Sequence, residues 1–440
     1  MTSFPRRGWR QPFALLAVLL MVLAMAPPGH AYSILTHEQL IELVWISDLQ
    51  PLLLRRYPGL TPAELRDAHA FAYGGAIVDD VGYYPYGNHL FSDLAHYARS
   101  GDLVAAMLDQ SRDANEFAFA LGMLAHYTAD CFGHPAVNES VGLEFPALQR
   151  RFGHVVTYED NPAAHMRVEF SFDILQIAKY RYPTQAYGDF VGFKISVPLL
   201  TRVYASVYGL PLERVLPDPE LAIGSFRYAV GTVLPKLDAA ALQSYRKQFF
   251  QQDPAFNPDA YRYGLKRAQF ERQWGRKYRH PSLLARLLAE CIVHLPKVGP
   301  LRGLEFRRPT AAAETLYLKS IDITIAQFRE SLAAEGYHAL RLPNRNLDTG
   351  ADTRRGDYRL ADQTYFQLTA ALAADGFTAV SPGLRDDILA FYAMPAVDGL
   401  SRRDSARLQG WLRRLQAMPA AAAGSNGTID SDAYSVAGPA

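Results

Sequence analysis

Apolar residues recur at helical spacing through most of this chain. After Thr36, the apolar positions between Leu40 and Trp45 lie three to four residues apart, which predicts a helix capped by the threonine. Six further segments share this periodicity, at 61–73, 89–100, 103–110, 113–132, 145–152 and 161–178. We found no strand-rich region. The pattern therefore predicts an all-α protein built as a multi-helix bundle.

Glycine, proline and polar clusters interrupt this periodicity and suggest the domain organisation. The stretch 74–87 is rich in glycine and tyrosine and predicts an irregular loop of the kind that often carries function. Helical patterns resume after Pro183, and we expect a further helical C-terminal region over 206–418, after a first domain over 32–205. The last residues, 419–440, lack apolar periodicity and predict a disordered tail.

Composition limits the class of protein and of partner. Hydrophobic residues make up 49% of the 440 residues and charged residues 20%, which is typical of a folded chain and excludes a disordered one. Lys and Arg number 45 against 44 Asp and Glu, so no global field attracts a polyanion. We therefore expect no stable nucleic-acid partner. The two cysteines, Cys131 and Cys291, are too few for a disulfide scaffold.

The N-terminus has the pattern of an export signal. Three arginines between Arg6 and Arg10 precede the apolar run 13–26, and Gly29-His30-Ala31 offers small residues for cleavage. The run is shorter than the roughly 20 residues that a spanning helix needs, although an uncleaved anchor stays an alternative. We predict a signal peptide over 1–31 and a secreted or periplasmic protein whose mature chain begins at Tyr32.

Candidate metal ligands occur in a helix of the first domain. His126, Asp130 and His134 follow one another at intervals of four residues, so they share a helical face if the helix lasts that long. Imidazole nitrogen and carboxylate oxygen are ligands that zinc takes in proteins. A single His-x-x-x-Asp pair is more often structural, but His165 and Glu169 repeat the spacing on the helix predicted over 161–178.

Further candidates lie upstream of this helix. His37 follows the predicted mature terminus by five residues, and Asp80 and His89 flank the tyrosine-rich stretch. Eight side chains, with the terminal amine and carbonyl of Tyr32, suit a cluster of up to three zinc ions in which one carboxylate bridges two of them.

Other residues compete for these roles. Asp79 is an alternative to Asp80, which we favour because of the neighbouring Gly82-Tyr83-Tyr84-Pro85 segment. Asp93 and His96 follow His89 by four and seven residues and are either partners that orient a ligand imidazole or structural residues. The remaining histidines lack a carboxylate at ligand spacing and are interpreted as structural: His69, His154, His280, His294 and His338.

The order of these residues resembles a known family. The series His37, Asp80, His89, His126, Asp130, His134, His165 and Glu169 is similar to the ligand series of the zinc-dependent phospholipase C and single-strand nuclease superfamily. Four short segments are also similar to those of a bacterial branch of uncertain substrate, at 36–38, 73–75, 82–85 and 158–162. The resemblance covers roughly residues 32–200.

The resemblance implies a distribution of three zinc ions. Asp80, His89, His126 and Asp130 would hold the first, His134, His165 and Glu169 the second, and Tyr32, His37 and bridging Asp130 the third. The chain departs from the family in having Tyr32 where tryptophan is usual and in the short gap from Asp130 to His134. The gap from Tyr32 to His37 is more like the nucleases, whereas Glu169 is more like the phospholipases.

The expected activity follows from these ions. A zinc-bound water supplies hydroxide near neutral pH, and Asp80 is our candidate base for that water. We expect a phospholipase C-type hydrolase that acts on a phospholipid or another phosphodiester, with transient contact to a membrane surface. A single-strand nuclease or other phosphodiesterase on the same metals, and a non-catalytic zinc-binding module, are the alternatives.

Overall fold

The chain folds into helices throughout the part that the computed structural model describes, which is residues 33–182, 193–258, 281–333, 341–395 and 399–418. Within these ranges there is no strand, and one isolated antiparallel bridge joins Arg345 to Asp352. The predicted all-α class is therefore confirmed. The predicted signal peptide, Tyr32 and the predicted C-terminal tail lie outside the described residues.

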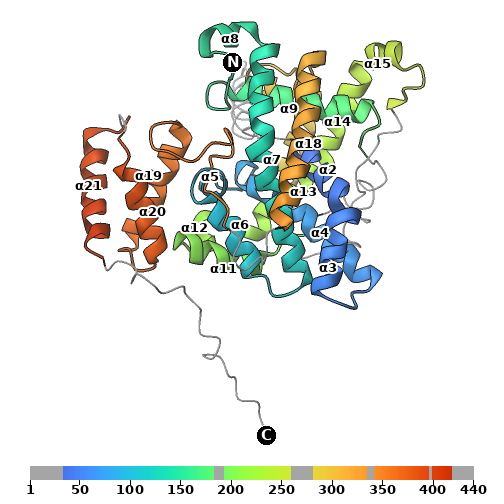
Figure 1. Ribbon diagram of the computed structural model, residues 1–440. Helices are drawn as coiled ribbons and strands as arrows, with labels where there is room; N and C mark the ends of the chain where they lie inside the picture. Colours follow the sequence, from blue (N-terminus) through green and yellow to red (C-terminus); the bar gives the residue numbers. More distant parts are fainter. Residues whose placement is uncertain (1–32, 183–192, 259–280, 334–340, 396–398, 419–440) are drawn as a thin grey trace, which may run out of the picture.

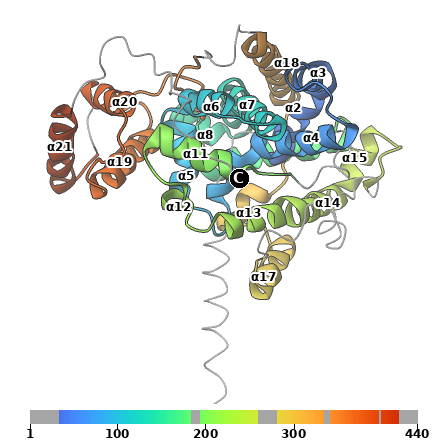
Figure 2. The ribbon, with the colours of Figure 1, turned by 90° about the horizontal axis from the view of Figure 1, so that it is seen from below.

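The elements follow in chain order (Figures 1 and 2). Those before residue 183 are α2 (Ile34–Val44), the π-helical turn η1 (Trp45–Leu49), α3 (Gln50–Arg56), α4 (Pro62–Ile77), the 3-10 helix η2 (Val78–Tyr83), α5 (His89–Tyr97), α6 (Ser100–Asp109), α7 (Ala114–Glu144), α8 (Pro146–Phe152) and α9 (Pro162–Ala178). Those after residue 192 are α11 (Val197–Tyr208), α12 (Leu212–Val215), α13 (Pro219–Tyr228), the π-helical turn η3 (Ala229–Val233), α14 (Leu234–Ser244), α15 (Arg246–Gln252), α17 (Leu283–His294), the 3-10 helix η5 (Gly299–Leu304), α18 (Ala311–Ala333), α19 (Arg359–Ala374), α20 (Pro382–Ala393) and α21 (Arg402–Gln416).

Helix α7 is the central element, and α4 and α18 pack along it (Figure 1). Glycines allow α4 and α7 to approach closely. A Cβ atom on Gly75 would collide with the backbone of Phe119, and one on Gly122 would collide with the backbone of Ala72. Helix α7 begins at an Asp113 cap, whose side chain accepts a hydrogen bond from the Glu116 amide at 2.8 Å.

Two local predictions were wrong. Helix α7 does not end near residue 132 but continues for 31 residues through Pro135, because packing on both sides outweighs the missing proline N–H. The stretch 74–87 is not an irregular loop over its first part, since α4 runs to Ile77 and η2 continues to Tyr83. His126, Asp130 and His134 therefore all lie on one helix, and Asp80 lies on a short helix.

The C-terminal helices share the core of the N-terminal ones. One cluster of buried apolar side chains extends from Ile34 in α2 to Leu415 in α21, although α19, α20 and α21 stand to one side of the bundle (Figure 2). The predicted boundary between residues 205 and 206 lies inside α11, so a break there would cut a helix. None of the described helices is long and apolar enough to cross a membrane.

Candidate metal centre

Histidine and carboxylate side chains from five helices converge in the interior of the bundle. Among the described residues, three groups place one potential ligand atom per residue within 4.8 Å of one another, and every member is buried. The groups are His37 with His126 and Asp130, Asp80 with His96 and His126, and His134 with His165 and Glu169.

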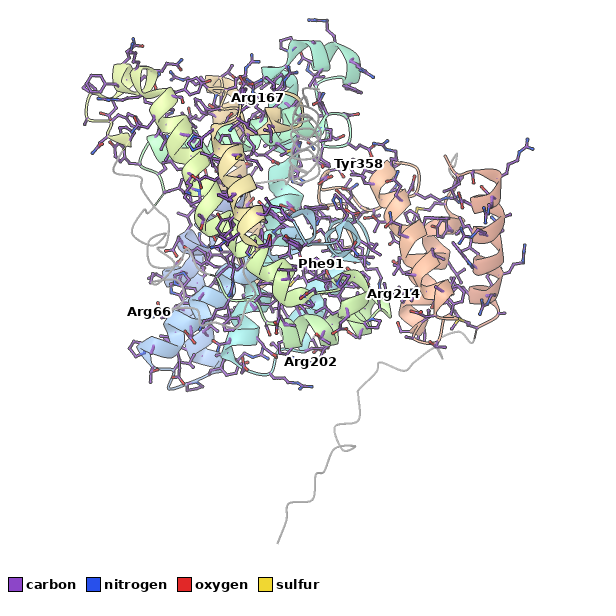
Figure 3. The ribbon with its side chains drawn as sticks, turned by 180° about the vertical axis from the view of Figure 1, so that it is seen from behind. Arg66, Phe91, Arg167, Arg202, Arg214 and Tyr358 are labelled. Atoms are coloured by element: carbon purple, nitrogen blue, oxygen red, sulfur yellow. The ribbon has the colours of Figure 1, made fainter. Side chains whose placement is uncertain are left out.

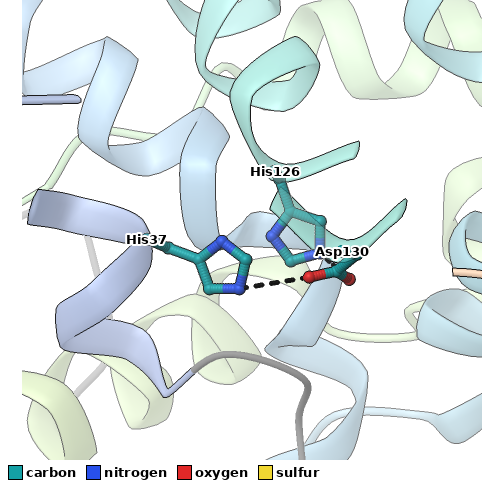
Figure 4. Close-up of side chains that lie close together, drawn as sticks. All are labelled: His37, His126 and Asp130. Carbon is teal, nitrogen blue, oxygen red and sulfur yellow. Dashed lines mark ion pairs between the residues drawn. The ribbon is translucent and has the colours of Figure 1, made fainter. Parts of the chain in front are cut away.

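The first two groups share His126 and surround Asp130 of α7. The Nε2 atoms of His37 and His126 lie 3.4 and 3.2 Å from the Asp130 carboxylate (Figure 4). The His37 and His126 rings stack with centroids 4.3 Å apart. His96 Nε2 from α5 lies 3.5 Å from Asp130 and 3.6 Å from Asp80. Asp130 is therefore the carboxylate around which imidazoles from three helices gather.

Backbone carbonyls orient two of these imidazoles. The Nδ1 atom of His96 lies 2.8 Å from the carbonyl oxygen of Ser92, and that of His126 lies 2.8 Å from the carbonyl oxygen of Ala76. A ring that donates from Nδ1 directs Nε2 to the opposite side, and that nitrogen binds a metal ion once its own proton is displaced. In both residues the Nε2 atom faces the carboxylates.

The third group joins α7 to α9. His165 and Glu169 lie one turn apart on α9, with 2.7 Å between Nε2 and Oε1, and the His134 ring from α7 stands edge-on to His165 at 5.5 Å. The cap of α9 positions this pair, since the Asn161 side chain accepts a hydrogen bond from the Ala164 amide at 2.9 Å.

The spacing around Asp130 fits zinc ligands better than hydrogen bonds. Ion-paired N–H···O bonds are usually about 2.7–2.9 Å long, whereas the four contacts of His37, His96 and His126 with the carboxylates measure 3.2–3.6 Å. Two ligand atoms about 2.0–2.1 Å from one tetrahedral zinc ion lie roughly 3.4 Å apart. Neither oxygen of Asp130 forms a hydrogen bond of ordinary geometry with a described residue. The residues present therefore suit divalent cations.

Comparison with known proteins agrees with this chemistry. The family model described as zinc dependent phospholipase C matches residues 36–215, a range that contains every member of the three groups. Residues 36–215 are similar to the zinc-dependent phospholipase C family. No curated protein and no solved structure matches the chain. The resemblance seen in the ligand series is thus confirmed over less than half of the chain.

The charge balance of this candidate metal centre also favours cations. Burial raises the pKa of Asp79 to about 7 and that of Glu169 well above its usual value. Burial opposes the charged form of His126, but the Asp130 carboxylate outweighs it and raises the pKa to about 10. Burial and His126 lower the pKa of His37 to about 3. Without an ion, Asp79 and Glu169 thus tend to hold protons, whereas the surrounding histidines outweigh burial and keep the pKa of Asp130 below its usual value. Divalent cations favour the ionised form of all three carboxylates.

The predicted site residues are placed as follows. Seven of them lie in the three groups: His37, Asp80, His126, Asp130, His134, His165 and Glu169. His89 is exposed at the start of α5, near the edge of the Tyr83 ring, and belongs to none of the groups. His96, which we had weighed as a partner of a ligand, occupies the second group. Asp79 is buried with Oδ2 4.0 Å from His126 Nε2.

The segment that precedes His37 is anchored close to the centre. Ser33 Oγ and Thr36 Oγ1 both donate to the buried carboxylate of Asp173 in α9, the latter at 2.8 Å. Thr36 Oγ1 also lies 3.0 and 2.9 Å from the hydroxyls of Tyr182 and Tyr317. The residue after Tyr32 is therefore held beside the helix that carries His165 and Glu169.

An apolar cavity of about 70 Å³ lies at the end of η2, and none of its lining residues belongs to the three ligand groups. Tyr84 lines it and lies four residues after Asp80, at the end of η2. The opposite wall comes from α13, α14 and α17, with Leu237, Ala285 and Ile292 among its residues. The family-matched part and the C-terminal region thus form this cavity together.

Proposed function

We propose that this chain is a secreted zinc-dependent phosphoesterase that hydrolyses phospholipids as a phospholipase C does. The observation that carries the proposal is the convergence of the three ligand groups, two of them around Asp130, inside the family-matched range. A structural zinc site closes its coordination with four ligands around one ion, whereas these groups share residues and suit neighbouring ions, as in hydrolases of phosphate esters.

We assign the ligands from the geometry. One ion takes Asp80, His96, His126 and Asp130, and His96 replaces His89 because only His96 lies within reach of Asp80. A second ion takes His134, His165 and Glu169. A third takes His37 and Asp130, together with the amine and carbonyl of Tyr32 after signal cleavage. The anchoring of Ser33 on Asp173 supports this last assignment.

The zinc ions, the histidines and Asp80 would have separate roles in hydrolysis. Zinc ions supply Lewis acidity, which neutralises phosphate oxygens and makes water acidic enough to attack phosphorus near neutral pH. His37, His96 and His126 would hold these ions through their Nε2 atoms, which lie beside Asp130. Asp80 accepts the proton of the attacking water, since it adjoins His96 and its 3-10 helix leads directly to the cavity.

The apolar cavity favours a lipid over a nucleic acid. Its lining of leucine, isoleucine, alanine and tyrosine suits an acyl chain or glycerol backbone, whereas a nuclease needs a basic groove with stacking platforms. Exposed leucines on α17 continue this apolar character at the surface, where Leu283 is 71% and Leu287 63% exposed. A membrane surface is therefore the proposed setting of the reaction.

The test combines metal analysis with three substrates. The mature form is purified, its zinc is counted by elemental analysis, and hydrolysis is measured on phosphatidylcholine vesicles, single-stranded DNA and bis(p-nitrophenyl) phosphate. We expect two to three zinc ions per chain, consistent with the three groups, and phosphatidylcholine hydrolysis that a chelator abolishes and added zinc restores. Asp80→Asn should lower kcat on every substrate.

Other outcomes would redirect the proposal. Hydrolysis of DNA without hydrolysis of phosphatidylcholine would show a nuclease on the same metals. A protein that carries its full zinc and hydrolyses none of the three substrates would be a zinc-binding module instead.

A further inference from the structure

A loop from outside the family-matched range packs directly against the metal centre. The Leu347 amide donates to the carbonyl oxygen of His96 at 2.9 Å, and the Asn138 side chain of α7 donates to the carbonyl oxygen of Asp348 at 2.7 Å. The same loop approaches Cys131 of α7 so closely that a Cβ atom on Gly350 would collide with its carbonyl oxygen. Pro135 has no N–H for that carbonyl, which leaves room for the loop.

The loop brings one buried carboxylate to a proposed ligand. Asp348 Oδ1 lies 3.5 Å from Nδ1 of His134, and Asp348 is 5% exposed. Its second oxygen accepts hydrogen bonds from Tyr97 at 2.7 Å and Tyr358 at 2.6 Å. Figure 3 labels Tyr358 where the C-terminal helices meet the rest of the molecule. Two tyrosines therefore hold the carboxylate in one orientation toward the imidazole.

We infer that Asp348 is a positioning residue that orients His134 for the second ion of the cluster. A carboxylate within ion-pair distance of Nδ1 favours the tautomer that carries the proton on that nitrogen, which leaves Nε2, on the opposite side of the ring, as the ligand atom. Partners of this kind tune metal affinity by about 10- to 100-fold. The C-terminal region thereby completes a centre whose three side-chain groups all lie in residues 36–215.

The geometry distinguishes this role from direct ligation. Asp348 belongs to none of the three ligand groups found among the described residues. Its carboxylate is therefore not one of three or more potential ligand atoms that all lie within 4.8 Å of one another. Its Oδ1 lies 3.5 Å from His134 Nδ1, and Tyr97 and Tyr358 occupy its other oxygen. A carboxylate held in this way supports a ligand and does not replace one.

The experiment measures zinc affinity and does not depend on activity. Full-length mature wild type and Asp348→Asn are loaded with zinc and titrated with a chelator of known affinity, and the ions lost at each step are counted. We expect one ion to be held about 10- to 100-fold more weakly in Asp348→Asn and to return at high zinc concentration. Tyr358→Phe should weaken the same ion to a smaller degree. Asp352→Asn is the matched control, because Asp352 is exposed in the same loop.

Thermal unfolding of the metal-free proteins distinguishes an effect of Asp348 on the orientation of His134 from an effect on the stability of the fold. Metal-free Asp348→Asn should unfold within a few degrees of metal-free wild type. Equal zinc affinity in wild type and Asp348→Asn would overturn the inference. So would a loss that excess zinc does not restore, which would make Asp348 a ligand, or a large drop in metal-free stability with unchanged affinity in Tyr358→Phe.

The inference rests on the proposed metal centre, and the two can fail separately. Zinc-loaded wild type that hydrolyses no phosphodiester would contradict the proposed function, while the chelator titration would still decide the role of Asp348. A wild type that binds no zinc at all would overturn both.

Discussion

Asp130 lies within 3.2–3.5 Å of ring nitrogens from His37, His96 and His126, which come from three different helices. A carboxylate in this position can bridge two ions, whereas Glu169 pairs with His165 in a separate group. At the scale of single residues, the centre therefore depends more on Asp130 than on any other ligand.

We predict that Asp130→Asn lowers the zinc content more than Glu169→Gln does. The amide carries no charge to offset two cations, so both ions that share the carboxylate should be weakened. Elemental analysis of the purified variants checks this, with the exposed Asp322→Asn on α18 as the control. If Asp130→Asn keeps its full metal and Glu169→Gln does not, the bridging ligand lies elsewhere.

Asp387, which is far from the centre in sequence, makes the free energy of unfolding depend on pH. Burial raises its pKa to about 6, although Arg99 and a 3.1 Å hydrogen bond from Tyr365 oppose the shift. The folded pKa is thus above the unfolded value of about 3.9, and the folded state binds this proton more tightly. Its effect is to reduce the free energy of unfolding as the pH rises from about 4 to about 6, and the loss persists at higher pH.

We predict that Asp387→Asn removes the decrease in unfolding free energy at higher pH. The amide oxygen can still accept the hydrogen bond from the Tyr365 hydroxyl. Relative to wild type, the variant should gain about 1–2 kcal/mol of unfolding free energy between pH 4 and pH 8, after allowance for solvent screening. Urea unfolding of both proteins at the two pH values measures the difference, in which titrations common to both cancel. A gain that is the same at both pH values would contradict the assigned pKa.

At the scale of helices, α5 shows why the proposed ligand set contains His96 and not His89. His89 and His96 are seven residues apart, so they share one face of the helix and differ by two turns, or about 10 Å along its axis. Sequence periodicity identifies the face of the helix on which a ligand lies, but not its position along the helix axis. The packing of α5 beside η2 brings the second of these histidines, and not the first, to Asp80.

Helix α17 supports a prediction about lipid contact. Its buried side lines the apolar cavity through Ala285, Ala289 and Ile292, while Leu283 and Leu287 face solvent. Burial of a leucine side chain is worth about 1.5–3 kcal/mol when complete, and about 1.4 kcal/mol corresponds to a tenfold change in binding. The double variant Leu283→Ser, Leu287→Ser should therefore bind phosphatidylcholine vesicles at least about tenfold more weakly.

Co-sedimentation with vesicles measures this binding, and hydrolysis of bis(p-nitrophenyl) phosphate shows whether the centre is intact. The soluble ester should be hydrolysed at the wild-type rate. Ile323→Ser on α18 is the control, because Ile323 is exposed on a helix that does not line the cavity. Unchanged vesicle binding in the double variant would exclude α17 as the membrane contact.

At the scale of the whole molecule, the segment that begins at Ser33 and the C-terminal region both lie beside the centre. Ser33 and Thr36 are tied to Asp173, and Thr36 also contacts Tyr317 of α18. The proposed third ion needs the neutral amine of Tyr32, whose unperturbed pKa of about 8 makes proton displacement by a metal easy near neutral pH. The proposed signal cleavage would thereby link export to assembly of the centre.

We predict that one extra residue before Tyr32 removes one zinc ion and leaves the others bound. The extension converts the amine into an amide nitrogen, which is a poor ligand, and it moves the terminus away from His37. Zinc counts and phosphatidylcholine hydrolysis are compared between protein that begins at a free Tyr32 and the extended form. Equal counts and equal activity would show that processing serves export alone.

The sequence by itself determined the helical class and pointed to most of the proposed ligand set, because both depend on local spacing. His126, Asp130 and His134 on one helix, and His165 with Glu169 on another, are recognisable from intervals of four residues. The helix patterns of 61–73 and 161–178 likewise follow from apolar periodicity and agree closely with α4 and α9.

Only the tertiary structure decided which of two histidines on α5 reaches Asp80, and that a loop around Asp348 closes on His134. Asp348 is more than two hundred residues from His134 along the chain and has no motif around it, so no local pattern relates the two. Their contact arises from the packing of α5, α7 and the loop, which depends on the whole core and not on any one segment.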